Sequence, residues 1–533
     1  MRPLYMKHGV RLFQCEAATT SREALMSKTT ISTGAILFQS GEAGDKKATP
    51  ANQPCHIVVL ADFSGRGHRG AHEPESLARR KVIEVDRDNF DEVFEQLKVE
   101  LDIPVIDDVI RFRELDDMHP DFIYDRTALF EKFKSLKRRL KSNDTFQAAA
   151  DEIRGWNGVA PKAETPAMEA KPSSAGASSD SGSLLESLLD STSGLQRSSN
   201  AFDVRTLVQE IFAPYVSQGP DPRQQEMLEA VDQAASDLMR KIMHHSAFHA
   251  LEASWRGLYL LVRRLETDAN LRVFIVDATR QELVADANAA ESIDETGLYK
   301  LLVEKRSASG ATPFSMILAD YAFGPESDSL NFLSTLAGSA HVVGAAALTG
   351  GSATLAGCGN LAETPDPDDW KDVVDAEFSE QWKSVREQVS AGSLAMVAPR
   401  VLLRMPYGKR TSRTERFDFE ELPERNRHAF YLWGNGAWLA VMLLAQHYTD
   451  FGWKFAPGRK QQVDRLPLHV YSEDGESVVT PCAEINITDS AVRALSQAGL
   501  MAVRSIVGKD SVLIPNFRSI SAVNPDLTGP WNE

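Results

Sequence analysis

The 533-residue chain lacks several features that would assign it to a common class of protein. It has only four cysteines, Cys15, Cys55, Cys358 and Cys482, which are widely spaced and form no CxxC pair. Such usage is typical of free thiols in a reducing compartment. No apolar run reaches the roughly 18 residues that a membrane span needs, and the first residues do not form a convincing signal peptide. The sequence therefore predicts a cytoplasmic protein without direct membrane insertion.

An excess of positive charge is also missing. The chain has 58 Lys and Arg against 75 Asp and Glu, a formal net charge of −17. Because an acidic chain repels phosphate backbones, this balance opposes a broad role in binding nucleic acid. No period of roughly 20–50 residues repeats, which argues against a solenoid. The length and the ordinary globular composition fit two or three domains.

No cofactor motif is complete in this sequence. Gly65, Gly67 and Gly70 in SGRGHRG fit the GxGxxG pattern of dinucleotide-binding proteins, directly after a predicted strand. The segment that follows contains Pro74 and is too short for a helix aimed at a pyrophosphate. We interpret SGRGHRG as a flexible basic surface loop, with a nucleotide site as the alternative. The glycine-rich stretch LTGGSATLAGCG lacks the GK[ST] of a P-loop and is predicted to be a loop.

Candidates for metal binding and catalysis are equally incomplete. His245 and His249 in HHSAFH have the i, i+4 spacing of a metal pair, but no Glu follows the first His as in HExxH. The nearby Glu252 is interpreted as a helix-surface residue, and the histidines as capping and packing residues. Paired acids lie in turns that contain proline, where Asp serves turn geometry: Asp116 with Asp117, and Asp366 with Asp368. The sequence therefore predicts no catalytic, cofactor or metal site, a pattern typical of an assembly or binding protein.

A change of composition divides the chain. In residues 158–183, 18 of 26 residues are Ala, Ser, Pro or Gly. Such a segment cannot bury enough apolar surface to offset its ordering entropy, so we expect a flexible linker. Before it, predicted strands at 56–63, 81–85 and 109–112 alternate with helices that continue to about Trp156. This alternation predicts a small α/β domain.

The longer C-terminal part also has an α/β pattern. Helices are predicted over residues 202–216 and 224–265, the second as one long helix. The stretches LRVFIVDA, PFSMILADYAF and VVGAAAL are predicted to be core strands or buried helix starts, and they alternate with helices such as residues 329–338. The fold class is therefore α/β, with a small N-terminal domain and a larger C-terminal domain joined by the linker.

A short amphipathic helix is predicted directly after the linker, at residues 184–195. Its leucines lie at i, i+1, i+4 and i+5 on one helical face: Leu184, Leu185, Leu188 and Leu189. An isolated helix of this length is marginal in water. We therefore expect it to fold against a partner, with docking onto its own C-terminal domain as the alternative.

Both halves resemble subunits of one machine, the type VI secretion contractile sheath. Residues 55–157 are similar to its small subunit, TssB or VipA, in VVLADFSGR, KVIEVDRDNFDEVFEQL, FRELDDMHPDFIYDR and TFQAAADEIRGW. Residues 183–520 are similar to its large subunit, TssC or VipB, in LMRKIMHHSAFHALEASWRGLYLLV, TGLYKLLVEK, ILADYAFGP, APRVLLRMPYG, YLWGNGAW and LPLHVY. The chain thus resembles a natural fusion of the two subunits, with a contractile-tail-sheath-like fold.

The resemblance implies a structural role without an active site. Sheath subunits polymerise around an inner tube of Hcp, and contraction drives that tube through a target membrane. The implied location is the bacterial cytoplasm, with the sheath attached at the inner membrane through the baseplate. A tether between the two halves would make their pairing intramolecular. The alternative is a non-polymerising sheath paralogue that acts as a baseplate adaptor or assembly regulator.

The resemblance also implies two kinds of contact site. Terminal arms add strands to neighbouring copies; the candidates are Ile31, Ile36, Leu37 and Phe38 in residues 30–38, and Val512, Leu513, Ile514 and Phe517 in residues 511–520. The leucine helix corresponds to the element that the AAA+ unfoldase ClpV recognises. The implied division is an N-terminal leader and arm (1–54), a TssB-like domain (55–157), the linker (158–183), the leucine helix (184–195) and a TssC-like domain with a C-terminal arm (200–533).

Overall fold

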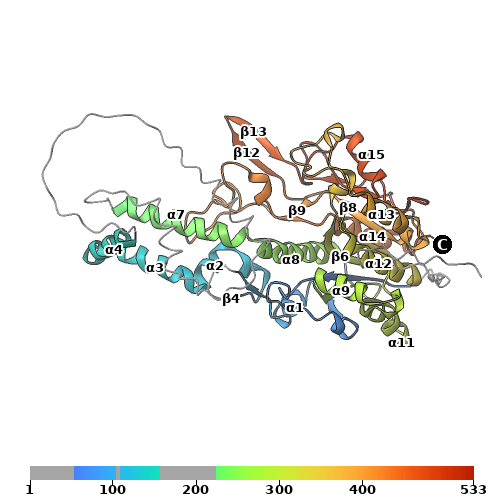
Figure 1. Cartoon of the computed structure of the whole chain (residues 1–533). Coiled ribbons are helices and arrows are strands. Elements are labelled where there is room, and N and C mark those ends of the chain that lie inside the picture. Colours follow the sequence, from blue (N-terminus) through green and yellow to red (C-terminus); the bar gives the residue numbers. More distant parts are fainter. Residues whose placement is uncertain (1–52, 104–108, 157–223, 533) are drawn as a thin grey trace, which may run out of the picture.

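The computed structural model describes residues 53–103, 109–156 and 224–532, which we divide into an N-terminal region (53–156) and a C-terminal region (224–532). A seven-stranded sheet with the order β14-β8-β7-β6-β1-β5-β2 forms the body at one end of the elongated molecule (Figure 1). Its strands are β1 (Cys55–Ala61), β2 (Ile83–Val85), β5 (Leu271–Asp277), β6 (Met316–Phe323), β7 (Ala346–Gly351), β8 (Leu394–Ala398) and β14 (Leu500–Ala502).

Strand β1 comes from the N-terminal region but lies inside the sheet of the C-terminal region. It pairs in parallel with β5 on one edge and with β6 on the other, and all seven of its residues are buried. Its β-branched run suits a central parallel strand that packs against both faces. The predicted α/β class is confirmed, but the two regions build one sheet together, with β2 antiparallel to β5 at the edge.

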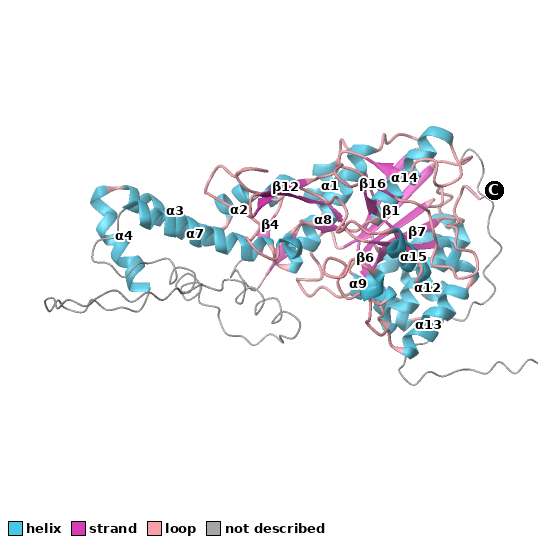
Figure 2. Ribbon diagram, turned by 90° about the horizontal axis from the view of Figure 1, so that it is seen from above, coloured by secondary structure: helices cyan, strands magenta, loops and turns pink. Residues whose placement is uncertain are grey.

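Helices cover both faces of this sheet (Figure 2). On the face that carries Ile57 and Val59 lie α1 (Phe90–Gln96), α8 (Ser246–Arg264) and α14 (Ala437–Phe451). On the face that carries Val58 and Leu60 lie α9 (Arg280–Ala289), α12 (Leu330–Val343), α13 (Ala376–Glu387) and α15 (Asp489–Gln497). The alternation of side chains along β1 thus divides the core into two layers.

A group of helices projects from the sheet body at the opposite end of the molecule (Figure 1). It contains α2 (Pro120–Arg126), α3 (Ala128–Lys141), α4 (Asn143–Trp156) and α7 (Gln224–Met243). The sequence predicts one helix over residues 224–265, and this prediction is wrong. The chain breaks between α7 and α8, where the His245 ring accepts a hydrogen bond from the backbone N–H of Ala247 at 3.3 Å and caps α8.

Smaller sheets complete the fold. The hairpin of β12 (His469–Glu473) and β13 (Glu476–Thr480) and a three-stranded sheet of β11 (Gln462–Val463), β16 (Val512–Leu513) and β15 (Arg504–Ser505) belong to the C-terminal region. Two-stranded pairs are formed by β9 (Val401–Leu402) with β10 (Trp433–Gly434), and by β3 (Glu100–Asp102) with β4 (Val109–Arg111).

Two further sequence expectations are tested by these elements. Within residues 53–103, 109–156 and 224–532, no helix is long and apolar enough to cross a membrane. Cys55, Cys358 and Cys482 are buried free thiols, as predicted, and Cys15 lies outside the described residues.

The burial of β1 predicts a large effect of truncating its side chains. Val59→Ala should lower the free energy of unfolding by roughly 2–3 kcal/mol, because it opens a cavity in the sheet core. The matched substitution Val470→Ala changes a strand residue that is 51% exposed and should stay within about 0.5 kcal/mol of the unchanged protein. Urea unfolding of the full chain measures both. Equal effects would mean that β1 does not pack in the centre of the sheet.

Candidate functional site: the contact between the two regions

The loop after β1 is held in place by its own polar groups. The Asp62 carboxylate accepts hydrogen bonds from the backbone N–H of Arg66 at 2.7 Å and of Gly67 at 2.8 Å. Gly65 has a φ of 74°, and a Cβ added there would lie 2.2 Å from the carbonyl oxygen of Glu100. Glycine is therefore required by backbone conformation and close approach. The predicted surface position is confirmed for His68 and Gly70, which are exposed. The prediction of a flexible loop is wrong, because these contacts hold its backbone in place.

Two arginines of the N-terminal region bind one buried carboxylate of the C-terminal region. Glu282 lies 2.9 Å from Arg66 Nη2 and 2.6 Å from Arg80 Nη2, and its side chain is fully buried. It also accepts hydrogen bonds from the backbone N–H groups of Glu73 and Thr279, both at 2.9 Å. Burial acts to raise the pKa of Glu282, but the hydrogen bonds from Arg66 and Arg80 outweigh it and lower the pKa to about 2. The carboxylate is therefore charged across the physiological range.

These contacts lie at the edge of the sheet where an α/β fold typically binds a ligand. That edge lies at the carboxyl ends of the strands, where the strand order reverses around β1. Here Asp277 at the end of β5 accepts hydrogen bonds from the backbone N–H of Ser64 at 3.0 Å and from its hydroxyl at 2.7 Å. Burial raises the pKa of Asp277. The polar groups at this edge bind one another and join the two regions.

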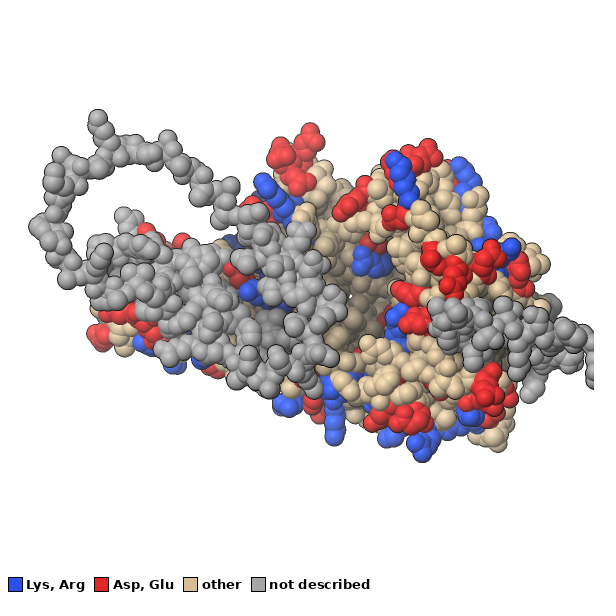
Figure 3. Space-filling view, in the orientation of Figure 1, with Lys and Arg blue, Asp and Glu red and all other residues tan. Residues whose placement is uncertain are grey.

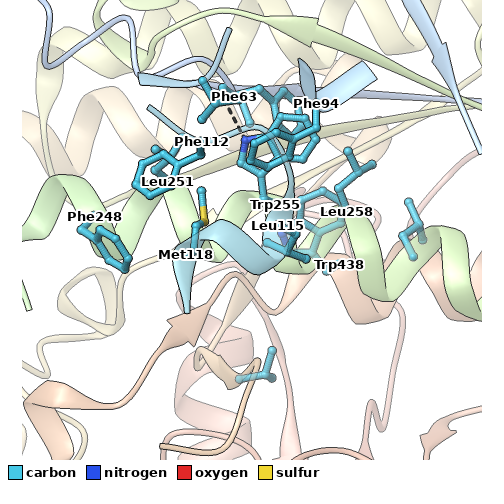
Figure 4. Packing of buried hydrophobic residues seen from close by; sticks show 14 of the residues in the cluster. Phe63, Phe94, Phe112, Leu115, Met118, Phe248, Leu251, Trp255, Leu258 and Trp438 are labelled. Carbon is cyan, nitrogen blue, oxygen red and sulfur yellow. Dashed lines mark hydrogen bonds between the residues drawn. The ribbon is translucent and has the colours of Figure 1, made fainter. Parts of the chain in front are cut away.

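An aromatic cluster forms the apolar part of the contact (Figure 4). Trp255 of α8 is fully buried and donates a hydrogen bond from Nε1 to the carbonyl oxygen of Phe63 at 2.8 Å. Its ring lies 5.1, 5.6 and 4.2 Å, between centroids, from Phe63, Phe90 and Phe94, all of the N-terminal region. One indole from the C-terminal region thus contacts the loop after β1 and both phenylalanines of α1.

Helices α8 and α14 cross closely above a buried acid. A Cβ added at Gly257 would lie 2.4 Å from the indole of Trp438, so α14 approaches α8 at this glycine. Asp320 of β6 lies beneath and accepts hydrogen bonds from Ser254 Oγ at 2.7 Å and Trp438 Nε1 at 3.0 Å. Burial raises the pKa of Asp320 to about 6.

A second buried ion-pair network lies on the other side of α8. Arg404 Nε is 2.7 Å from Glu252, and Arg404 Nη1 is 2.7 Å from Glu421. The interpretation of Glu252 as a helix-surface residue is wrong, because its side chain is fully buried and also binds Arg256 at 2.7 Å. Burial acts to raise the pKa of Glu252, but the charges of Arg404 and Arg256 lower it to about 2. Arg404 is 152 positions from Glu252, so the sequence carries no signal for that pair. Glu252 and Arg256, by contrast, have the local i, i+4 spacing of a helix pair.

The segment that follows Arg404 packs on helix α2 of the N-terminal region. Asp121 accepts hydrogen bonds from the backbone N–H groups of Glu415 at 2.9 Å and Arg416 at 3.0 Å. The ring of Tyr124 stacks on Phe417 with centroids 4.6 Å apart. The buried network and this segment therefore form a further contact between the two regions.

The remaining histidines of HHSAFH are packing residues within the described part of the chain. His244 lies 4.5 Å from the Phe430 ring and 5.7 Å from the His249 ring, between centroids. Burial lowers the pKa of His249 to about 4. Among residues 53–103, 109–156 and 224–532, no group of three or more His, Cys, Asp or Glu could hold a metal ion.

The predicted arm at residues 511–520 is folded into its own chain. Val512 and Leu513 form β16, which pairs with β11 on one edge and β15 on the other. Val512 and Ile514 are fully buried, and Phe517 is 6% exposed. Val512 and Leu513 of this predicted arm are therefore paired on both backbone edges within their own chain. A role of these residues between copies stays a prediction. Residues 30–38 and the leucine helix at 184–195 lie outside the described residues.

Comparisons with known proteins identify the family. Residues 225–521 match the family VipB, described as EvpB/VC_A0108, tail sheath N-terminal domain. Residues 39–153 match a family described as type VI secretion system, VipA, VC_A0107 or Hcp2. The chain is 28% identical over 284 residues to the type VI secretion system sheath protein TssC1 of Pseudomonas aeruginosa, covering 52% of this chain and 57% of that protein. The chain thus spans little more than half the length of this relative.

The protein is therefore a type VI secretion sheath protein of the VipB family that carries a VipA-like region in the same chain. The predicted fusion is confirmed. The family is one of structural sheath proteins and not of enzymes. The contact between the two regions is thus a contact between two family modules within one chain.

The raised pKa of Asp320 predicts a specific pH dependence of stability. The folded protein binds this proton more tightly than the unfolded chain, so stability falls as the pH rises through about 6. Between pH 4 and 7 the contribution of Asp320 to the free energy of unfolding should decline by about 2 kcal/mol. Asp320→Asn should remove this decline, as measured by urea unfolding at several pH values, because its amide does not titrate but can accept from Trp438 Nε1 and donate to Ser254 Oγ. Parallel pH profiles for the two proteins would contradict the assignment.

The buried carboxylate of Glu282 predicts a large cost when its charge is removed. Glu282→Gln should lower the free energy of unfolding by roughly 3–5 kcal/mol, because two arginines lose their buried partner. Its lowered pKa means that this contribution is present above about pH 4.5 and is lost as the pH falls towards 2. The control is Glu84→Gln, which removes an exposed pair with Arg272 at 3.4 Å and should cost less than about 1 kcal/mol. Similar losses for both variants in thermal unfolding would refute the role of Glu282.

Proposed function

We propose that this chain is a structural protomer of a type VI secretion contractile sheath, which polymerises around an Hcp inner tube and contracts to drive effector delivery. The observation that carries the proposal is the position of β1. The VipA-like region supplies the central strand of the VipB-like sheet, so one chain provides the paired unit that two family modules build. The seven-stranded sheet of this protomer is therefore completed by a strand of the same chain and not by a second protein.

The proposed partners are further copies of the chain, the Hcp inner tube, the baseplate and a ClpV-type unfoldase. We propose that the leucine helix at residues 184–195 binds the unfoldase, and that the sheath lies in the bacterial cytoplasm, attached at the inner membrane through the baseplate. We propose that the chain is divided into a leader and arm (1–54), a VipA-like domain (55–157), a linker (158–183), the leucine helix (184–195) and a VipB-like domain with a C-terminal arm (200–533).

The hairpin β12–β13 is the best candidate in the described chain for receiving a strand from a neighbouring copy. Among the described residues, β12 and β13 pair only with each other. Val470 and Val479 lie opposite one another on one face and are 51% and 40% exposed. Unpaired edges beside an apolar surface favour strand addition. We propose that residues 30–38 of another copy occupy this hairpin.

A second candidate function is a non-polymerising sheath paralogue that acts as a baseplate adaptor or assembly regulator. It is favoured by the placement of β16, whose two edges are occupied within the chain. In such a protein, Val512 and Leu513 already pair on both edges and are not available to add to a neighbouring copy.

Electron microscopy of the concentrated full chain separates the two candidates. A sheath protomer should form tubes, and Val470→Lys with Val479→Lys should reduce the assembled fraction roughly tenfold, because two charges replace the apolar face of the receiving hairpin. The matched control is Val507→Lys with Val523→Lys at positions 78% and 77% exposed, which should assemble normally. Monomers at all concentrations and salts would instead support the paralogue.

A further inference from the structure

A short basic turn stands out in this acidic chain. Residues 409–416 contain four Lys or Arg and one acid, although the whole chain has a net charge of −17. Lys409 lies 3.1 Å from Asp418, whereas Arg410 and Arg413 are exposed and form no ion pair with any residue of the described ranges. We call residues 409–413 the basic turn.

The basic turn is rigidly supported. The backbone N–H of Gly408 donates to the carbonyl oxygen of Ser412 at 2.9 Å, and the Thr411 hydroxyl donates to the carbonyl oxygen of Pro406 at 2.6 Å. The turn begins next to the buried pair of Arg404 and Glu421. Because the backbone is fixed, binding through Arg410 and Arg413 requires ordering of only two side chains.

A complementary surface lies elsewhere on the same chain. Residues 363–380, which we call the acidic segment, contain eight Asp or Glu and one lysine. Its backbone is also fixed: the Trp370 Nε1 donates to the carbonyl oxygen of Thr364 at 2.8 Å, and Asp366 accepts from the N–H of Asp368 at 3.1 Å. Asp368 and Asp369 are exposed and form no ion pair within the described part of the protein.

The two surfaces cannot neutralise each other within one molecule. The basic turn is followed by Arg416, which contacts α2, whereas the acidic segment leads into α13. In Figures 1 and 2, α2 lies towards the helical projection and α13 lies in the sheet body at the opposite end. In the view of Figure 3, acidic and basic side chains are interspersed over the described part of the visible face, and no large area of that face carries one sign of charge alone.

We propose that the basic turn of one copy binds the acidic segment of a second copy. The contact is head-to-tail, because two different surfaces meet, and head-to-tail contacts generate rings or open helical filaments. Opposite charges favour this head-to-tail arrangement, whereas contacts between two basic turns or two acidic segments are disfavoured by repulsion. The inference rests on the proposed function, since it names a contact by which copies of the protomer would assemble.

Charge reversal with rescue tests the contact. Arg410→Glu with Arg413→Glu should lower the pelleted fraction of the full chain roughly tenfold, as should Asp368→Lys with Asp369→Lys, because each change places like charges opposite one another. A chain that carries all four changes should recover assembly, since the attraction is restored with its signs exchanged. The control, Lys132→Glu with Lys305→Glu, makes the same charge change at exposed sites outside both surfaces and should assemble normally.

Dilute wild-type protein provides a readout that does not need tubes. Sedimentation velocity should detect association that weakens between 50 and 300 mM NaCl, because salt screens exposed charges, and that is lost in either reversed variant. Dimers without tubes would support this contact and refute the polymer. The contact would be overturned if both reversed variants still formed tubes, or if only one of them lost assembly. It would also be overturned if the chain with all four changes did not regain assembly, or if no salt-sensitive association were detected.

Discussion

The structure depends on one backbone constraint, the need of β5 and β6 for a strand between them. Both strands direct hydrogen-bonding edges at β1, which lies between them with every residue buried. Unpaired backbone groups inside a core cost free energy comparable to lost hydrogen bonds. The VipB-like region alone would therefore carry an open slot in its sheet. Its core is complete only with the VipA-like strand, and the fusion supplies that strand in the same chain.

The position of β1 determines what surrounds it. The loop at its carboxyl end contains Arg66, which forms an ion pair with Glu282. Helix α1 contains Phe90 and Phe94, whose rings pack against Trp255. Ligand-binding α/β proteins leave the carboxyl edge of the sheet open at this point. In this protein, charged groups at the same edge bind each other across the two regions. The fold thus uses a typical ligand-binding position for internal cohesion, as suits a structural component.

Local sequence patterns predict the elements of this fold well. The run HIVVLA predicts a buried strand, which forms as expected. LRVFIVD, predicted to be a core strand or a buried helix start, forms a strand. The arrangement of strands could not be predicted, since pairing between residues more than 200 positions apart leaves no local trace. The burial of Glu252 was missed for the same reason, because its partner Arg404 is 152 positions away. Residues 511–520 show a limit of local patterns, since an apolar run near a terminus suits both an arm and a strand such as β16, which pairs within its own chain.

The central claim is that the VipA-like and VipB-like regions form one fold around β1. The most direct measurement inserts a protease site between residues 158 and 183, cleaves the native protein and analyses the product by size-exclusion chromatography. We expect both fragments to elute together and to unfold in a single transition, because the sheet holds them together without the linker. Two separate, independently folded fragments would contradict the claim.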